Sequence, residues 1–220
     1  MTPERFARMR RVLEGRQPDL TVLMDGVHKP YNLSAVARSC DAVGVLEVHA
    51  VPAEDPRPLN RQVSAGTAKW IPMRVYESTE SATAELRRQG FSLVAAHTDP
   101  AAVDFREIDF TRPTAIVVGS ELHGLSDATL AQVDHTVFVP MVGMVRSLNV
   151  SVAAAILLYE AQRQRQDAGM YATPRLEPDR LESLLIEWAH PEIARSCRAA
   201  GLPYPTLEAD GEVVELPDGF

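Results

Sequence analysis

Short apolar runs of strand length alternate with segments of helical spacing along most of this 220-residue chain. The strand-like runs lack the in-and-out polar alternation of a half-solvated sheet, so we expect both of their faces to be buried. This order predicts an α/β fold, in which a mostly parallel sheet carries helices on both faces. The predicted strands cover residues 20–24, 46–51, 71–76, 91–96, 114–118 and 136–139, and the predicted helices cover 33–43, 78–89, 126–133 and 149–166.

Both ends of the chain differ from this alternating region. A helix is predicted near the N-terminus, with Thr2 as N-cap, Pro3 in the first helical position and Gly15 at its end. Prolines at 174, 178, 191, 203 and 205 favour a small helical appendage and an irregular tail, and three prolines within 52–59 predict a loop. The expected parts are an N-terminal basic helix at 1–17, a central α/β domain at 18–166 and a C-terminal extension at 167–220.

The formal net charge of −8 argues against a polyanionic partner, but the charge is unevenly distributed. Residues 1–17 carry five arginines against two acidic residues, whereas the last twenty residues are acidic. The basic segment can bind a nucleic acid, or its arginines can merely solvate a helix, and charge alone leaves both interpretations open. These arginines are Arg5, Arg8, Arg10, Arg11 and Arg16.

Several protein classes are disfavoured because their signals are missing. No apolar run approaches the roughly eighteen residues of a membrane span, and the first residues lack the apolar core of a signal peptide. Cys40 and Cys197 have no metal-type spacing, so we expect reduced thiols in a cytoplasmic protein. The sequence has no G-x-G-x-x-G after a strand, no P-loop, no G-x-S-x-G elbow and no H-E-x-x-H. We therefore expect no dinucleotide site, no nucleotidase site and no metal site.

Asn32 and Arg38 stand six residues apart on one predicted helix. Asn32 occupies a position suited to an N-cap, which is its simplest role. Arg38 lies off the apolar stripe of this helix, which includes Val36 and Cys40, at about 100° per residue. The arginine is therefore expected to face solvent, a partner or a ligand.

Glu121 lies between Gly119 and Gly124 in a turn that follows a predicted strand. Ligands of open α/β sheets bind where strands run out at their carboxyl ends, and glycines there let a ligand approach the backbone closely. An ordinary strand-to-helix turn is the alternative interpretation.

Ser147 and Asn149 precede a long helix whose first turns are almost wholly apolar. A helix that is apolar on all sides is expected to be buried. Its free N–H groups would then point into the protein or into a site. Either a polar ligand or self-capping by Asn149 would satisfy these donors.

Together these motifs resemble the SpoU branch of the SPOUT RNA methyltransferases. Asn-x5-Arg, strand-Gly-x-Glu-x-x-Gly and Pro-Met-x-Gly-x-x-x-Ser-Leu-Asn-Val-Ser occur in that family's order, between residue 20 and about residue 165. The flanking segments Val27-His-Lys-Pro and Gly201-Leu-Pro-Tyr-Pro are similar to family members that methylate guanosine 18 of tRNA.

The resemblance implies a C-terminal deep trefoil knot and a homodimer. It also implies transfer of a methyl group from S-adenosylmethionine to the ribose 2′-oxygen of guanosine 18 in the D-loop of tRNA. Two alternatives stay open: the same transfer to another RNA such as 23S rRNA, and a non-catalytic RNA-binding protein.

The resemblance further implies roles for individual residues. Arg38 would activate the acceptor, either as a base or by binding a phosphate and stabilising the developing alkoxide. The second role suits a guanidinium better, because this group stays protonated in proteins. Asn32, Glu121, Ser147 and Asn149 would shape the catalytic site.

Cofactor contacts and RNA contacts are expected at two further sets of residues. The implied cofactor residues are Ala96, Gly119, Val139, Met141 and Leu148, where Ala96 replaces a threonine expected from the resemblance. Phosphate contacts are expected from Arg8, Arg11, Arg163 and Arg165.

Overall fold

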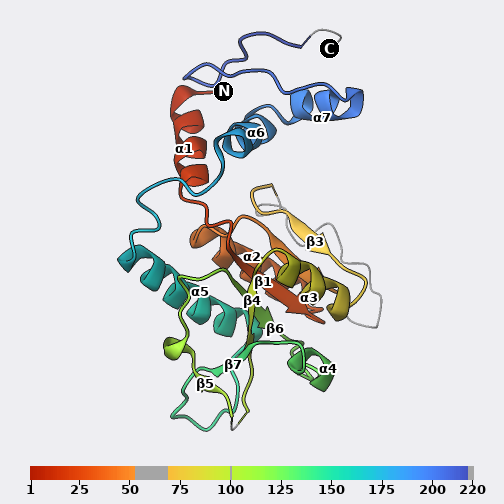
Figure 1. Ribbon diagram of the computed structural model, residues 1–220, viewed down its shortest axis with the longest axis vertical. Helices are drawn as coiled ribbons and strands as arrows, with labels where there is room; N and C mark the ends of the chain where they lie inside the picture. Colours follow the sequence, from red (N-terminus) through yellow and green to blue (C-terminus); the bar gives the residue numbers. More distant parts are fainter. Residues whose placement is uncertain (53–68, 100, 218–220) are drawn as a thin grey trace. The chain divides into compact units, whose positions relative to one another are not determined.

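The computed structural model describes residues 1–52, 69–99 and 101–217. The chain divides into two compact units, one of residues 17–170 and one of residues 1–16 together with 171–220. The larger unit holds the sheet, and the smaller one holds α1, α6 and α7 (Figure 1). Apart from Pro52, the loop predicted at 52–59 lies outside the described residues.

The predicted parallel sheet is confirmed. Seven strands pair in the order β3-β2-β1-β6-β4-β7-β5, and every pairing is parallel. Each of the six predicted strands is present, with ends that differ by up to two residues. The strands are β1 (Leu20–Asp25), β2 (Val48–Val51), β3 (Met73–Val75), β4 (Ser92–Ala96), β5 (Val103–Asp104), β6 (Thr114–Val118) and β7 (His135–Phe138).

The strand order places chain segments side by side that lie far apart in the sequence. β6 is inserted between β1 and β4, so that Ile116 is opposite Val22 on one side and Val94 on the other. Similarly, β7 pairs with both β4 and β5. Because all strands are parallel, the carboxyl ends of β1, β6, β4 and β7 meet at one edge of the sheet, and the loops that follow these strands meet there too.

Helices cover both faces of the sheet, as predicted (Figure 1). α2 (Pro30–Ala42) and α5 (Val150–Asp167) pack on one face, where Val36, Leu157 and Ile116 belong to one buried cluster. α3 (Thr79–Arg88) and α4 (Asp127–Leu130) lie on the other face, where Leu86 and Val117 belong to a second cluster. Strand residues alternate between the two clusters, which explains why the strand sequences are apolar throughout.

Local signals set most helix ends where they were expected. Thr2 caps α1 (Pro3–Glu14) by accepting a hydrogen bond from the Arg5 N–H. Ser78 forms a capping box with Ser81 at the start of α3. Asn149 caps α5 with its own side chain, which accepts from the Ser151 N–H at 2.9 Å, so the self-capping alternative is confirmed.

The segment between β4 and β6 contains two elements that were not predicted. It forms the short strand β5 and a 3-10 helix at Phe105–Glu107, and it is then clipped to α5. Gln164 makes this clip by donating to the Ile108 carbonyl at 2.9 Å and accepting from the Phe110 N–H at 2.8 Å. Phe110 is fully buried. Neither element could be predicted from hydrophobic periodicity, since each spans only two or three residues.

The smaller unit pairs α1 with α6 (Pro178–Ala189), and α7 (Pro191–Ala200) follows α6 directly. Arg10 of α1 donates to Glu182 of α6 at 2.7 Å. Gly211 lies against the Phe6 ring with a φ of +90°, and a Cβ there would meet ring atoms at 2.6 Å.

Within the described part of the chain, no helix combines the length and the apolarity required to cross a bilayer.

Candidate functional site

The candidate site lies at the carboxyl edge of the sheet in the larger unit. Three loops meet there: residues 26–29 after β1, 119–125 after β6, and 139–149 after β7. These loops carry three of the sequence motifs described above, and the first turn of α2 carries Asn32. The edge of a parallel sheet therefore gathers residues that are up to 117 positions apart in the sequence.

A hydrogen-bonded chain of three side chains joins α5, α2 and the loop after β6. Asn149 Nδ2 donates to Asn32 Oδ1 at 3.3 Å, and Asn32 Nδ2 donates in turn to Glu121 Oε1. Asn32 is almost completely buried, at 1% exposure. Because its oxygen accepts from Asn149 and its nitrogen donates to Glu121, the orientation of the Asn32 amide is fixed.

The prediction that Asn32 caps its helix is wrong. Helix α2 begins at Pro30, with Lys29 in the N-cap position and no side-chain cap. Proline is favoured in the first turn because its missing N–H would be unpaired there anyway. Asn32 therefore falls inside the helix, and its side chain is free to serve the site.

Glu121 carries a largely buried negative charge, with a side chain only 9% exposed. Burial raises the pKa of this carboxyl, but the hydrogen bond from Asn32, its backbone hydrogen bond and the electrostatic effect of the neighbouring His28 and Lys29 together outweigh that effect, so the net pKa is below the usual value. Its second oxygen, Oε2, lies 3.0 Å from His28 Nδ1, in ion-pair range but without hydrogen-bond geometry. His28 was not among the residues selected from the sequence. Its only signal was its place in the Val27-His-Lys-Pro segment, directly before α2.

Gly119 is required by the turn itself. A Cβ at this position would lie 2.3 Å from the Gly124 carbonyl carbon and oxygen and 2.5 Å from the Leu125 nitrogen. The turn is closed by reciprocal backbone hydrogen bonds between Ser120 and Gly124, at 3.0 and 2.9 Å. Close packing of the backbone, independent of any ligand, thus accounts for this glycine and fixes the loop that holds Glu121.

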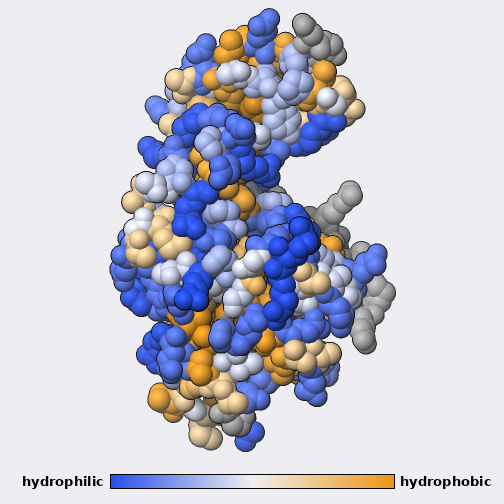
Figure 2. All heavy atoms as spheres, viewed as in Figure 1, coloured by the Kyte–Doolittle hydropathy of each residue, from blue (hydrophilic) through white to orange (hydrophobic). Residues whose placement is uncertain are grey.

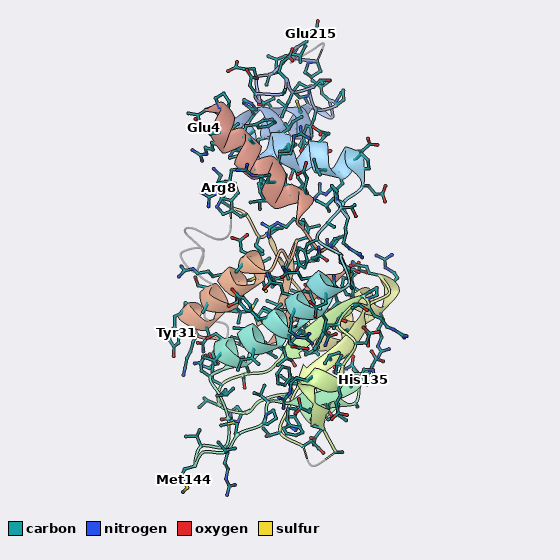
Figure 3. All side chains as sticks on the ribbon, turned by 90° about the vertical axis from the view of Figure 1, so that its left-hand side faces the viewer. Glu4, Arg8, Tyr31, His135, Met144 and Glu215 are labelled. Atoms are coloured by element: carbon teal, nitrogen blue, oxygen red, sulfur yellow. The ribbon has the colours of Figure 1, made fainter. Side chains whose placement is uncertain are left out.

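The loop at 139–149 is the most exposed apolar part of the larger unit. Val142 and Met144 are fully exposed, and Met144 projects at the end of the loop away from the sheet (Figure 3). Figure 2, in the view of Figure 1, shows apolar residues gathered at the end of the unit where this loop and β5 lie. No backbone group of residues 139–148 is hydrogen-bonded to the backbone of another described residue.

The residues expected to contact a cofactor line this same edge. Ala96 ends β4 and Gly119 follows β6, while Val139, Met141 and Leu148 belong to the loop after β7. All three of the loop side chains are partly buried, and Val139 packs against the core. Partly covered apolar side chains beside unpaired backbone groups suit a planar, polar-edged ligand.

Arg38 and Ser147 stand apart from the hydrogen-bonded chain. Both are exposed, and neither makes a side-chain hydrogen bond or an ion pair with any described residue. The exposure of Arg38 agrees with its predicted position off the apolar stripe. Within this single chain, the structure joins Asn32, Glu121 and Asn149 but does not bring Arg38 or Ser147 to them.

The prediction that the first turns of α5 are buried on all sides is wrong for the single chain. Ala154 and Leu157 are buried against the sheet, but Val152 and Tyr159 are 46% and 53% exposed. Ile156, which lies between them, is only partly buried. One side of the helix therefore packs on the sheet, while an apolar stripe on the other side is open.

The arginines expected to bind RNA fall into different environments. Arg8 and Arg11 are exposed on α1, and neither has a side-chain partner among the described residues (Figure 3 shows Arg8). Arg163 is exposed but paired with Glu160 and Asp167, at 2.7 and 2.9 Å.

Arg165 is the exception, and its predicted RNA contact is wrong. Its side chain is fully buried and forms an ion pair with Asp19 at 2.6 Å. It also donates to Gln17 and to three backbone carbonyls, those of Phe110, Asp19 and Arg112. A guanidinium whose donors are all directed into the protein cannot reach a phosphate.

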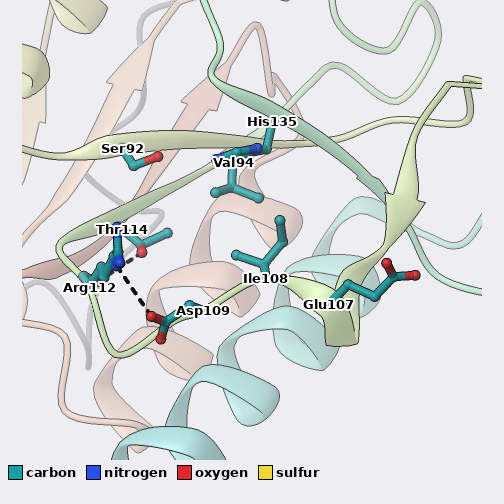
Figure 4. Close-up of a pocket in the computed structure, with 8 residues that line it drawn as sticks. All are labelled: Ser92, Val94, Glu107, Ile108, Asp109, Arg112, Thr114 and His135. Atoms are coloured by element: carbon teal, nitrogen blue, oxygen red, sulfur yellow. Dashed lines mark hydrogen bonds and ion pairs between the residues drawn. The ribbon is translucent and has the colours of Figure 1, made fainter.

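A pocket of about 300 Å³ lies at the opposite edge of the sheet (Figure 4). It is lined by the first residues of three strands, Ser92 of β4, Thr114 of β6 and His135 of β7, and by the 107–112 segment. The polar groups joined at the carboxyl edge do not line it. The sequence motifs therefore do not assign this pocket as the functional site.

Among the described residues, no group of three or more His, Cys, Asp or Glu side chains could hold a metal ion.

Comparison with known protein families identifies this arrangement. Residues 19–159 match the model of the SpoU rRNA methylase family, and residues 163–216 match the model of the SpoU rRNA methylase C-terminal region. The chain belongs to the SpoU methylase family. The trefoil knot expected from the resemblance is a feature that membership of this family implies.

Curated SpoU methylases similar to this chain include tRNA (guanosine(18)-2′-O)-methyltransferases. The Escherichia coli K12 protein is 48% identical over 97% of this chain and 94% of its own length. A Thermus thermophilus protein is 49% identical over 85% of this chain and 96% of its own length. A 23S rRNA (guanosine-2′-O-)-methyltransferase of Pseudomonas syringae is 38% identical over 67% of this chain and 60% of its own length.

Solved SpoU structures share the fold. The Aquifex aeolicus TrmH/SpoU tRNA modifying enzyme superposes with a TM-score of 0.79 at 42% identity, over 86% of this chain and 96% of that one. The SpoU methyltransferase AviRb of Streptomyces viridochromogenes, in complex with the cofactor AdoMet, superposes with a TM-score of 0.58 at 34% identity, over 70% and 62% of the two chains.

Proposed function

We propose that this chain transfers a methyl group from S-adenosylmethionine to the ribose 2′-oxygen of guanosine 18 in the D-loop of tRNA. The observation that carries the proposal is the 48% identity to the Escherichia coli guanosine-18 enzyme over 97% of the chain, which includes the flanks outside the sheet. Similarity to the 23S rRNA enzyme is confined to 67% of the chain. A larger share of the chain is therefore similar to the tRNA enzyme than to the rRNA enzyme.

The carboxyl edge of the sheet fits the proposed methyl donor. The partly buried side chains of Val139, Met141 and Leu148 and the backbone groups of the loop at 139–148 would hold the donor. Ala96 and Gly119 would form the floor at the ends of β4 and β6. S-adenosylmethionine supplies a methyl group already activated as a sulfonium, so the protein must orient the acceptor and manage its proton.

The hydrogen-bonded chain of Asn32, Glu121 and Asn149 would hold the acceptor ribose, and Ser147 would approach it from the loop after β7. Glu121 would contribute its buried carboxylate, which accepts a hydrogen bond from the Asn32 amide and so fixes that amide beside the ribose. Arg38 would bind a tRNA phosphate and stabilise the developing alkoxide. A planar fork of donors suits a phosphate, whereas a group that stays protonated is a poor base.

We further propose that the active form is a homodimer in the cytoplasm. On α5, the exposed Val152 and Tyr159, with the partly buried Ile156 between them, have the heptad-like spacing of a helix that packs against a partner. A second copy would cover this stripe and could bring its Arg38 and Ser147 to a shared site. Cys40 and Cys197 are both buried and neither forms a disulfide, which suits a reducing compartment.

We also propose that the part of the chain at 1–17 serves RNA binding, that residues 18–166 carry the transfer, and that 167–220 form a C-terminal extension. The unpaired Arg8 and Arg11 support this division.

The test is methyl transfer from labelled S-adenosylmethionine to separate tRNA and rRNA transcripts, followed by nucleoside mapping. We expect label in tRNA at 2′-O-methylguanosine 18, and none in a matched tRNA carrying 2′-deoxyguanosine at that position. Label in rRNA alone would replace the proposal by the rRNA alternative. Binding of RNA without any transfer would favour a non-catalytic protein.

A further inference from the structure

His28 is held in place by the segment that joins β1 to α2. Gly26 turns the chain at the end of β1 with a φ of +66°, and its N–H donates to the Val51 carbonyl at 3.0 Å. Val27 is buried in the core at 2% exposure, and Pro30 begins α2. Only His28 and Lys29 lie between these anchors, so the backbone of His28 has little freedom beside the candidate site.

The imidazole of His28 faces the buried carboxylate of Glu121. Nδ1 lies 3.0 Å from Oε2, while the His28 side chain is 41% exposed and that of Glu121 is 9% exposed. Oε1 of the same carboxylate is already taken by Asn32. A carboxylate this close to one ring nitrogen stabilises the positive charge that the ring gains when the other nitrogen accepts a proton. Nε2 has no partner among the described residues.

Other side chains at this edge are less suited to accept a proton. Asn32 and Asn149 have no basic atom, and Arg38 stays protonated. The net effect of its surroundings lowers the pKa of Glu121, which makes this carboxylate a weaker base than usual. His97 and His123 lie at the same edge, but their side chains contact no carboxylate among the described residues.

We propose that His28 is the catalytic base of this transfer, with Nδ1 in ion-pair range of Glu121 and Nε2 accepting the proton of the ribose 2′-hydroxyl. As the 2′-oxygen forms its bond to the methyl carbon, the carbon–sulfur bond breaks and its electron pair stays on sulfur. The hydroxyl proton passes to Nε2, and the Glu121 carboxylate balances the charge of the imidazolium. Solvent takes this proton afterwards through the exposed side of the ring. The assignment rests on the proposed function.

The test compares wild type with His28→Asn in single-turnover methyl transfer at saturating tRNA and S-adenosylmethionine, from pH 5 to 9. The asparagine side chain is polar like that of histidine, but its amide cannot take up a proton. The wild-type rate should rise with pH, because only the neutral ring accepts a proton. We expect His28→Asn to lose this rise and to be slower by about 10²- to 10⁴-fold. Calorimetric dissociation constants for cofactor and tRNA should stay within about two-fold.

His135→Asn is the matched control, since His135 is an exposed histidine at the opposite edge of the sheet, and it should behave as wild type. A His28→Asn rate within three-fold of wild type, or a slow variant that keeps the same rise with pH, would overturn the assignment. If His28→Asn fails to bind cofactor, His28→Ala with added imidazole decides: restored transfer supports a base, and a folded variant without rescue contradicts one. Wild type that transfers nothing to tRNA would instead remove the proposed function.

Discussion

Nη1 of Arg165 lies 2.6 Å from Oδ1 of Asp19, inside the larger unit and 146 residues away in the sequence. This ion pair joins the last turns of α5 to the segment that leads into β1. The neighbouring Arg163 faces solvent and pairs only with residues of its own helix. Two arginines separated by one residue therefore have opposite environments, which provides a matched pair for measurement.

Replacing Arg165 by alanine should lower the free energy of unfolding by about 3 to 5 kcal/mol, because Asp19 and three backbone carbonyls lose a buried partner. Arg163→Ala should leave the denaturation midpoint close to wild type, since exposed ion pairs contribute little. Urea denaturation followed by circular dichroism measures both. Equal effects of the two substitutions would contradict the structural role given to Arg165.

Arg38→Ala should reduce the single-turnover rate of methyl transfer by at least about two orders of magnitude, as expected for loss of a preorganised transition-state donor. Affinity for S-adenosylmethionine and the melting temperature should stay near wild type, because the side chain is exposed and unpaired.

Arg38→Lys separates charge from geometry at this position. Lysine keeps the charge but loses the planar fork that can hold a phosphate by two bonds. We expect it to be nearly as slow as alanine. A lysine variant with most of the wild-type rate would show that a simple positive charge is sufficient.

Neutralising Arg8 and Arg11 together should weaken tRNA binding and reduce the slope of log affinity against log salt by about 1.5, because two phosphate contacts would release fewer counterions. Affinity for S-adenosylmethionine should not change. Arg195→Ala is a suitable control, since Arg195 is paired with Glu192 at 2.6 Å on α7. An unchanged salt slope would remove α1 from the RNA-binding surface.

Light scattering should report about twice the chain mass of 24.2 kDa. Val152→Glu should shift the protein toward a monomer and reduce transfer, since it places a charge on the apolar stripe of α5. Val75→Glu is the control, because Val75 is equally exposed, at 51%, on the edge strand β3. A fully active monomer would refute the shared site.

His49 should make the protein less stable in mild acid. The ring is 1% exposed and lies 2.9 Å from the Tyr76 hydroxyl, through Nδ1. Burial, with a further contribution from the Arg74 charge, lowers the pKa of His49 to about 4, against 6.5 for an ordinary histidine, while Glu85 opposes the shift. The unfolded chain therefore binds a proton between these pH values when the folded chain does not, so stability falls as the pH drops from 6.5 to 4.

The loss due to His49 should be of the order of 2 kcal/mol at about pH 4.5 relative to about pH 7. His49→Gln can keep a hydrogen bond to Tyr76 but does not titrate, so it should lose less stability over this range. Urea denaturation at the two pH values measures the difference. Parallel losses in both proteins would assign the acid sensitivity to other groups.

The order and type of most elements could be predicted from the sequence alone, because their signals are local. Thr2, Ser78 and Asn149 cap helices through atoms two or three residues away. Apolar runs buried on both faces indicate parallel strands whatever their neighbours are. The exposure of Arg38 also followed from helical geometry, since it depends only on the angle between that residue and the apolar stripe of its own helix.

The tertiary structure decided everything that depends on which distant segments meet. The insertion of β6 between β1 and β4 places Glu121 beside Asn32 and His28, and no local pattern contains that pairing. The same holds for Arg165: its place on a polar helix end favours solvent exposure, but the ion pair with Asp19 buries it. Helical period and capping act over one or two turns, whereas burial and ion pairing are set by contacts across more than a hundred residues of chain.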